Sequence, residues 1–163
     1  IQSYNDDIFY VAEENRWSKF YAESLHAPFK VVGWDGLFAR TKNVPKLLSI
    51  TDNPAELVDT MNIVRKNFGD KVEVTRSHPM FAEFLTKGVT KAGAIKILAD
   101  KFNIANEEIL AIGDSENDLP MLMSAGIGVA MGNASDNVKK YCRHITDTCD
   151  RGGFVKAVYK YVL

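Results

Sequence analysis

The sequence predicts an α/β fold, in which helices cover a parallel sheet in the C-terminal half and a second α/β segment precedes it. Beyond about residue 78, predicted helices and strands alternate regularly along the chain. The two clearest strands there, Ile109–Ile112 and Ile127–Met131, are uninterrupted apolar runs. Such runs are typical of strands buried on both faces, as in parallel sheets covered by helices.

The first part of the chain mixes strands and helices. One helix start is well marked, because Asn53 can cap the helix, Pro54 suits its first position and Glu56 sits where a capping box requires it. This helix is expected to end at Gly69. A second helix is expected at Glu13–Leu25, and the predicted strands are Asp7–Ala12, Lys30–Trp34, Lys46–Thr51, Lys71–Thr75 and Met80–Leu85.

The second part of the chain surrounds its two apolar strands with helices. In open sheets of this kind, ligands bind beyond the C-terminal ends of the strands. Polar side chains that follow a strand directly are therefore candidates for a site. The predicted helices are Thr90–Phe102, Asn117–Ser124, Ser135–Tyr141 and Gly153–Val162, with a short strand at His144–Thr146.

The bulk composition is that of an ordinary globular protein. The chain has 163 residues, of which 46% are hydrophobic and 25% charged, so disorder is not expected. The formal net charge of −1 provides no overall positive field, and neither a nucleic acid nor a membrane is expected as a partner. No apolar run approaches the length of a membrane span, and the first residues lack the features of a signal peptide.

The cysteines and the first residue give two further expectations. Cys142 and Cys149 are expected to be reduced thiols of a cytoplasmic protein, with a disulfide as the alternative. No His/Cys cluster has the spacing of a zinc site. The chain starts at Ile1 without an initiator Met, and so it reads as the interior of a longer chain unless processing removed a Met.

An acidic turn, Gly113-Asp114-Ser115-Glu116-Asn117-Asp118, follows the Ile109–Ile112 strand directly. Asp114 is expected at the C-terminal end of the strand, and Asn117 and Asp118 at the start of the next helix. Converging carboxylates repel one another, and a hard cation such as Mg²⁺ relieves that repulsion. The alternative is a solvated loop with ordinary helix caps. Its position directly after a buried strand favours a functional site.

A lysine, Lys91, lies near the start of the helix predicted at Thr90–Phe102. A lysine at this end of a helix is unfavourably placed in the helix dipole, but a lysine and a helix N-terminus together suit a phosphate. The alternative is that Lys87 and Lys91 are simply surface charges. Glycines also flank the strand Ile127–Met131, where taken singly they indicate only turns.

In this order, Lys91, the acidic turn 113–118 and the segment 128–134 (Gly-Val-Ala-Met-Gly-Asn-Ala) resemble the C-terminal motifs of the haloacid dehalogenase (HAD) superfamily. The closest resemblance is to its Cof-type phosphatase branch, and it covers about residues 72–163. It implies that residues 79–163 form the C-terminal half of a core with a partial doubly wound, Rossmann-like parallel sheet. Residues 1–78 resemble that branch's α/β cap domain, incomplete at its N-terminus, by pattern more than by motif.

The resemblance implies a role for each matching residue. Lys91 matches the lysine that steadies the transferring phosphoryl group and the nucleophile, and Asn117 matches a residue that orients the phosphate. Asp114 matches the Mg²⁺-binding acid, and Asp118 the second acid, which supports the metal through water or hydrogen bonds. The implied catalytic residues are thus Lys91, Asp114 and Asp118, with Mg²⁺ as the cofactor. Ala92 stands where many relatives have glycine.

The implied function is Mg²⁺-dependent hydrolysis of small phosphorylated metabolites, such as sugar phosphates, through an aspartyl-phosphate intermediate. Members of the family begin with a strand that ends in Asp-x-Asp-Gly, whose first aspartate is the nucleophile. None of the twelve aspartates here belongs to an Asp-x-Asp pair, and the Ser/Thr motif that should follow is missing too. We therefore expect this chain to lack an N-terminal segment, as a fragment or as a natural truncation, and to be inactive alone.

Two other functions are open on the sequence. Similar motifs occur in the phosphorylation domains of P-type ion pumps, although the lack of a membrane span and the cap-like segment before Lys91 disfavour a pump. A non-catalytic module that binds Mg²⁺ or a protein partner is favoured by the missing nucleophile. The sequence leaves the substrate and the oligomeric state open.

Several other polar and aromatic residues have ordinary structural interpretations. The histidines His26, His78 and His144 are scattered along the chain, and the aromatic set Trp17, Phe20 and Tyr21 is expected in a core. Arg76 and Glu83 either line a substrate cleft or form a surface ion pair.

Overall fold

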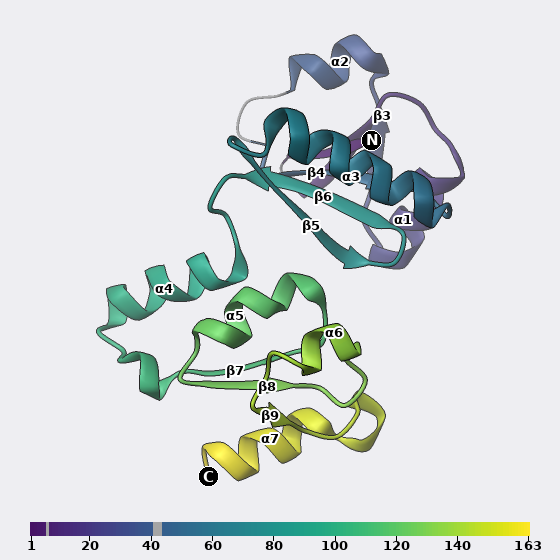
Figure 1. Ribbon diagram of the computed structural model, residues 1–163. Coiled ribbons are helices and arrows are strands. Elements are labelled where there is room, and N and C mark those ends of the chain that lie inside the picture. Colours follow the sequence, from purple (N-terminus) through teal and green to yellow (C-terminus); the bar gives the residue numbers. More distant parts are fainter. Residues whose placement is uncertain (6, 41–43) are drawn as a thin grey trace. The chain divides into compact units, whose positions relative to one another are not determined.

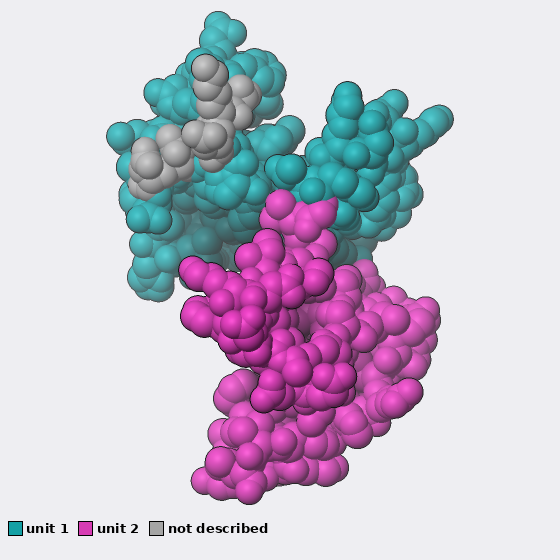
Figure 2. Space-filling model, turned by 90° about the vertical axis from the view of Figure 1, so that its left-hand side faces the viewer, with its two compact units in different colours: residues 1–87 teal, residues 88–163 magenta. Residues whose placement is uncertain are grey.

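The computed structural model describes residues 1–5, 7–40 and 44–163, which divide into two compact units, residues 1–87 and 88–163 (Figure 2). The sequence placed the division after residue 78 instead. The boundary lies later because β6 (Phe81–Thr86) pairs with both β4 (Lys46–Ile50) and β5 (Val72–His78) in the sheet of the first unit. Each unit contains helices and a sheet with parallel strands, which confirms the predicted α/β fold class.

The first unit is built on a six-stranded sheet with the order β3-β2-β1-β4-β6-β5. Its neighbouring strands are antiparallel, except that β2 and β3 are parallel. The other strands are β1 (Gln2–Asn5), β2 (Ile8–Val11) and β3 (Phe29–Val31), and the helices are α1 (Arg16–Leu25), α2 (Gly33–Ala39) and α3 (Pro54–Phe68) (Figure 1).

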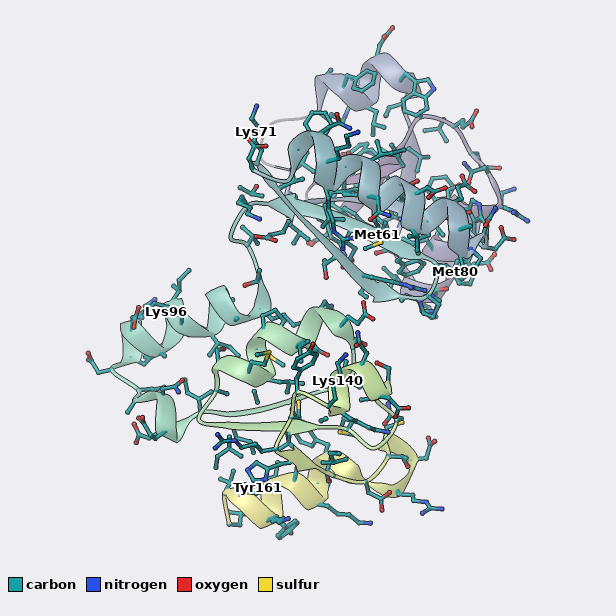
Figure 3. The ribbon with its side chains drawn as sticks, in the orientation of Figure 1. Met61, Lys71, Met80, Lys96, Lys140 and Tyr161 are labelled. Atoms are coloured by element: carbon teal, nitrogen blue, oxygen red, sulfur yellow. The ribbon has the colours of Figure 1, made fainter. Side chains whose placement is uncertain are left out.

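Helices α1 and α3 pack on opposite faces of this sheet. Leu48 of β4 pairs with Glu83 of β6, so its side chain lies on the face opposite to that of the adjacent Ala82. Tyr21 of α1 packs in the cluster that contains Leu48, whereas Met61 of α3, labelled in Figure 3, packs against Ala82. The sheet of the first unit therefore has a hydrophobic core on each face.

The strand predicted at Lys30–Trp34 is wrong in its second half. β3 ends at Val31, and α2 begins at Gly33, whose φ is +67°. Glycine adopts this left-handed backbone region without side-chain strain, so the chain can turn there from the sheet into a helix. Neither α2 nor β1 was predicted from the sequence.

The predicted start of α3 is confirmed, but the capping box with Glu56 is not formed, because the Asn53 N–H donates to Thr51 Oγ1 (3.1 Å) instead. Asn53 Oδ1 accepts hydrogen bonds from the backbone N–H groups of Ala55 (3.1 Å) and Glu56 (3.3 Å), and the helix ends before Gly69. The Glu56 carboxylate accepts a hydrogen bond from Thr51 Oγ1 (2.9 Å). The helix is therefore capped by Asn53, with Glu56 holding Thr51 just ahead of it.

Replacing Asn53 by alanine should lower the free energy of unfolding by about 1 kcal/mol, because two N–H groups lose their acceptor. Urea unfolding of the variant and the wild type measures the difference. The matched control is Asn62→Ala, at an exposed position inside the same helix, which should leave stability unchanged or slightly higher. If both variants lost the same free energy of unfolding, the Asn53 cap would contribute no more to stability than an exposed residue inside the helix.

The second unit contains a three-stranded parallel sheet with the order β7-β8-β9, which confirms the predicted parallel sheet. Its strands are β7 (Leu110–Gly113), β8 (Ile127–Ala130) and β9 (His144–Ile145). Its α-helices are α4 (Lys91–Phe102), α5 (Leu119–Ser124), α6 (Asp136–Lys139) and α7 (Gly153–Tyr161), and its 3₁₀ helices are η1 (Asn106–Glu108), η2 (Glu116–Asp118) and η3 (Cys149–Arg151).

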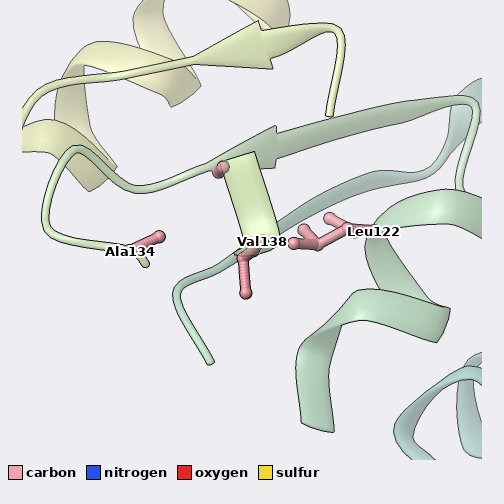
Figure 4. Packing of buried hydrophobic residues seen from close by; sticks show 5 residues of the cluster. Leu122, Ala134 and Val138 are labelled. Atoms are coloured by element: carbon pink, nitrogen blue, oxygen red, sulfur yellow. The ribbon is translucent and has the colours of Figure 1, made fainter. Parts of the chain in front are cut away.

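The hydrophobic core of the second unit lies between its sheet and helices α5 and α6. Ala111 of β7 and Ala130 of β8 form a buried cluster with Leu122, Ala134 and Val138 (Figure 4). Helix α7 lies on the other side of the sheet from α5 and α6 (Figure 1). Helices on both faces are what the apolar strand sequences predicted.

Candidate functional site

Two loops follow neighbouring parallel strands and meet at one edge of the sheet in the second unit. Gly113, the last residue of β7, pairs with Ala130, the last residue of β8. The Gly113 carbonyl also accepts a hydrogen bond from the Met131 N–H (2.9 Å). The loop 114–118 and the loop 131–135 therefore begin side by side, at the edge where the sequence predicted a site.

Asp118 is the buried centre of this region, with 4% of its surface exposed. Its Oδ2 atom accepts hydrogen bonds from the backbone N–H groups of Asp114 (3.1 Å) and Ser115 (3.2 Å). Its Oδ1 atom lies 2.5 Å from the ammonium nitrogen of Lys91. Both carboxylate oxygens of Asp118 are thus occupied by donors of the chain. The backbone of the acidic turn folds back onto this carboxylate.

Gly113 provides the space for the Asp118 side chain. A Cβ atom at position 113 would lie 2.6 Å from Asp118 Cβ and 2.8 Å from its Cγ, closer than real side chains approach. The backbone of Gly113 has no positive φ. Gly113 therefore serves close packing against Asp118 rather than a left-handed turn.

Lys91 is the first residue of α4, which Thr90 caps through a hydrogen bond from the Gly93 N–H to Thr90 Oγ1 (3.0 Å). Its side chain is 54% exposed, whereas that of Asp118 is 6% exposed. An ammonium group has three N–H donors. The ion pair with Asp118 therefore holds the Lys91 ammonium group on its buried side. The other N–H donors of this group remain open to solvent, from which an anion can approach.

Asp114 follows β7 and is exposed. Its Oδ1 atom accepts a hydrogen bond from Ser115 Oγ (3.2 Å), and its Oδ2 atom accepts one from Asn133 Nδ2 (3.1 Å). Both donors are neutral, and within residues 1–5, 7–40 and 44–163 no ion pair to Asp114 is formed. Asp114 therefore has no cationic partner among the described residues at this edge of the sheet.

Asn117 lies in η2, between these two aspartates along the chain. Its Oδ1 atom is buried and has no hydrogen-bond partner among the described residues. Leaving a buried acceptor unpaired costs roughly 1–3 kcal/mol, so this atom suits a hydrogen-bond donor that the described residues do not supply.

The structure thus brings the predicted residues together at one edge of one sheet. Asp118 contacts Lys91 through one oxygen and the Asp114 backbone through the other. Sequence reasoning missed the side-chain contact of Asn133 with Asp114. The available signal was its position in the loop that follows β8, three residues after the strand ends and at the same edge as the acidic turn.

Arg76 and Glu83, also considered from the sequence, belong to the first unit and bond to other residues of that unit. Arg76 donates to the carbonyls of His78 and Pro79, and Glu83 pairs with Lys46 at 2.6 Å. Arg76 and Glu83 therefore do not form the ion pair considered as one alternative. Both cysteines are free, as expected, and burial raises the pKa of the Cys142 thiol.

Among the described residues, no group of three or more His, Cys, Asp or Glu side chains is gathered in a way that could hold a metal ion by itself. No helix among these residues combines the length and apolar character needed to cross a membrane.

Comparison with known proteins identifies relatives over most of the chain. A Bacillus subtilis protein named 5-amino-6-(5-phospho-D-ribitylamino)uracil phosphatase YcsE is 40% identical over 105 residues, 64% of this chain and 41% of its own length. A Haemophilus influenzae protein is 31% identical over 149 residues, 91% of this chain and 55% of its own length. The chain thus spans about half the length of these curated relatives.

Solved structures are similar over nearly the whole chain. A haloacid dehalogenase-like hydrolase from Bacteroides thetaiotaomicron is 31% identical with a TM-score of 0.80, covering 98% of this chain and 59% of its own. A sugar phosphatase of HAD subclass IIB is 28% identical with a TM-score of 0.80, again covering 98% of this chain and 59% of its own. Residues 1–158 also match the family model of the haloacid dehalogenase-like hydrolases. The chain belongs to the haloacid dehalogenase-like hydrolase family.

Proposed function

We propose that this chain carries the metal- and phosphate-handling residues of a phosphatase that acts on small phosphorylated metabolites. The observation that carries the proposal is the position of Asp118, which contacts both Lys91 and the Asp114 backbone at the C-terminal edge of the sheet. The Lys91 ammonium group and the carboxylates of the acidic turn are thereby held close to one another. Phosphoryl transfer depends mainly on such positioning and charge neutralisation.

Lys91 is proposed to bind the phosphoryl group. Its contact with the buried Asp118 limits the positions open to the ammonium group, while its exposure leaves N–H donors for phosphoryl oxygens. Donors fixed in advance stabilise charge that develops in the transition state without a cost of reorganisation. Asp118 therefore acts on the reaction through Lys91 and through the backbone of the acidic turn.

Mg²⁺ is the proposed cofactor, and the residues present fit it. Mg²⁺ binds through one or two carboxylates and completes its shell with water and phosphate, so the absence of a larger acidic cluster among the described residues is compatible with it. Asp114 would hold the ion directly, and Asp118, whose oxygens are occupied, would support it through hydrogen bonds. When bound, Mg²⁺ would neutralise part of the phosphate charge. The unpaired Asn117 Oδ1 could accept a hydrogen bond from a water molecule bound to Mg²⁺ or to the phosphate.

The nucleophile is proposed to come from residues outside this 163-residue chain. No Asp-x-Asp pair occurs in the sequence, and the phosphoaspartyl route requires its first aspartate. That aspartate would attack phosphorus and break the ester P–O bond, which releases the alcohol of the substrate. Water would then hydrolyse the aspartyl-phosphate to inorganic phosphate and the free carboxylate. The chain alone is therefore expected to be inactive.

Sugar phosphates and similar phosphorylated metabolites are the proposed substrate class. The support is the naming of relatives, one as a phosphatase of a phosphoribityl compound and one as a sugar phosphatase. We also propose a cytoplasmic location, for which the two free cysteines are the support.

The proposal is tested by p-nitrophenyl phosphate hydrolysis with Mg²⁺, comparing the product of the complete gene with the 163-residue chain. We expect the complete product to hydrolyse the ester and the 163-residue chain to be inactive. Activity in the 163-residue chain alone would overturn the argument about the nucleophile. Inactivity of both would favour the second candidate, a non-catalytic module that binds Mg²⁺ or a partner, for which the missing Asp-x-Asp pair is the specific observation.

A further inference from the structure

Asn133 connects the Asp114 carboxylate to the loop that follows β9. Its Nδ2 atom donates to Asp114 Oδ2 (3.1 Å), and its Oδ1 atom accepts the backbone N–H of Cys149 (3.0 Å). We propose that Asn133 is a positioning residue, which sets the orientation of the Asp114 carboxylate toward the cation. This inference rests on the proposed function and adds a residue to which no role was given above.

The chemistry of the two contacts fixes which way the Asn133 amide faces. The backbone N–H of Cys149 can only donate, so the Asn133 atom that faces it must be the oxygen. The amide nitrogen then necessarily faces Asp114, where an ionised carboxylate can only accept. The reverse orientation would oppose two donors at one end and two acceptors at the other.

The loop that holds Asn133 is itself anchored. The Gly132 N–H donates to the Asp147 carbonyl (3.0 Å), and a Cβ atom at position 132 would lie 2.8 Å from the backbone of Asp147 and Thr148. The Asp147 carboxylate accepts hydrogen bonds from Lys156 Nζ and the Thr148 N–H, both at 2.8 Å. These contacts, that of Lys156 first, hold the pKa of the Asp147 carboxyl below its ordinary value. Gly132 thus allows the close approach that brings Asn133 to Cys149.

The two aspartates of the turn have different kinds of partner. Among the residues that the structure describes, the Asp118 carboxylate pairs with Lys91, whereas the Asp114 carboxylate accepts hydrogen bonds from two neutral donors, Ser115 Oγ and Asn133 Nδ2. Neutral donors orient a carboxylate and leave its charge for a cation. Hydrogen-bond partners of this kind behind a metal ligand typically alter metal affinity by about 10–100-fold.

The test is a Mg²⁺ titration of the 163-residue chain followed by NMR of its backbone amides. Asn133→Ala should weaken Mg²⁺ binding at the 113–118 turn by about 10-fold. The matched control is Asn137→Ala, since Asn137 donates to Glu116 in the same turn (3.4 Å) but does not contact Asp114. We expect the control to bind Mg²⁺ as the wild type does. Amide spectra that are unchanged away from the site establish that each variant is folded.

A second measurement needs no variant. In the wild-type chain, the side-chain NH₂ resonances of Asn133 should shift as Mg²⁺ is added, whereas those of Asn137 should not. Wild-type affinity in a folded Asn133→Ala variant overturns the inference. So do stationary Asn133 side-chain resonances when the Asp114 amide responds to Mg²⁺. If the Asp114 amide resonance of the wild-type chain does not shift when Mg²⁺ is added, the proposed function itself is overturned. Failure of the proposed function can therefore be distinguished from failure of the Asn133 inference.

Discussion

Replacing Lys91 by methionine in the product of the complete gene should lower kcat for p-nitrophenyl phosphate by about 10²–10³-fold. Methionine retains much of the length of the side chain but has no charge and no N–H donor. The variant leaves the buried carboxylate of Asp118 without its cation, and it removes the donors proposed to meet the phosphoryl oxygens. Steady-state kinetics at saturating Mg²⁺ measure the loss.

Lys96 provides the matched control for this substitution. It lies on the same helix, α4, and its exposed ammonium group pairs with Asp100 at 3.1 Å, one turn further along. Lys96→Met should leave kcat within about twofold of the wild type, because surface ion pairs of this kind contribute little. Similar losses in both variants would mean that charge on the helix, rather than the position of Lys91, determines the rate.

Replacing Phe9 by alanine should lower the free energy of unfolding by about 3–5 kcal/mol. Phe9 is 1% exposed. The centroid of its ring lies 5.4 Å from that of the Tyr21 ring and 5.3 Å from that of the Phe29 ring. The substitution removes the largest fully buried side chain of the first unit and leaves a cavity between its sheet and α1. Denaturant unfolding, monitored separately from the second unit by amide resonances, measures the effect.

Phe38→Ala is the corresponding control. Phe38 is in the same unit but is 65% exposed, and it stacks only loosely on Trp34, with ring centroids 6.0 Å apart. Its loss should cost about 1 kcal/mol or less. If Phe9→Ala lowered the free energy of unfolding no more than Phe38→Ala does, the rings of Phe9, Tyr21 and Phe29 would not form the core of the first unit.

Hydrophobic pattern predicted elements whose apolar residues are regularly spaced, but it missed β1, whose buried residues are polar. The β8 strand and the α3 helix were predicted within a few residues, because apolar spacing and the Asn53 cap define them locally. β1 was missed because Gln2 and Ser3, at 3% and 2% exposure, occupy buried sheet positions without an apolar pattern. Their burial depends on pairing with β2 and β4, which no local signal reveals.

The members of the candidate site could be predicted better than the contacts among them. Motif order selected Lys91, Asp114 and Asp118, but it did not indicate that Lys91 pairs with Asp118, 27 residues away, rather than with Asp114. That choice depends on where α4 begins relative to the turn, and on the space that Gly113 leaves for Asp118. The contact of Asn133 with Asp114 likewise depends on the register of β7 and β8.

The proposed role of the acidic turn, holding a divalent cation beside Lys91, is tested most directly by Mn²⁺ added to the 163-residue chain. Paramagnetic Mn²⁺ broadens the NMR signals of nearby nuclei even when it binds weakly. We predict selective broadening of the amides of residues 113–118 and of Asn133, abolished by Asp114→Asn. Broadening spread over unrelated acidic surface, or unchanged by Asp114→Asn, would contradict the assignment of a cation site to this turn.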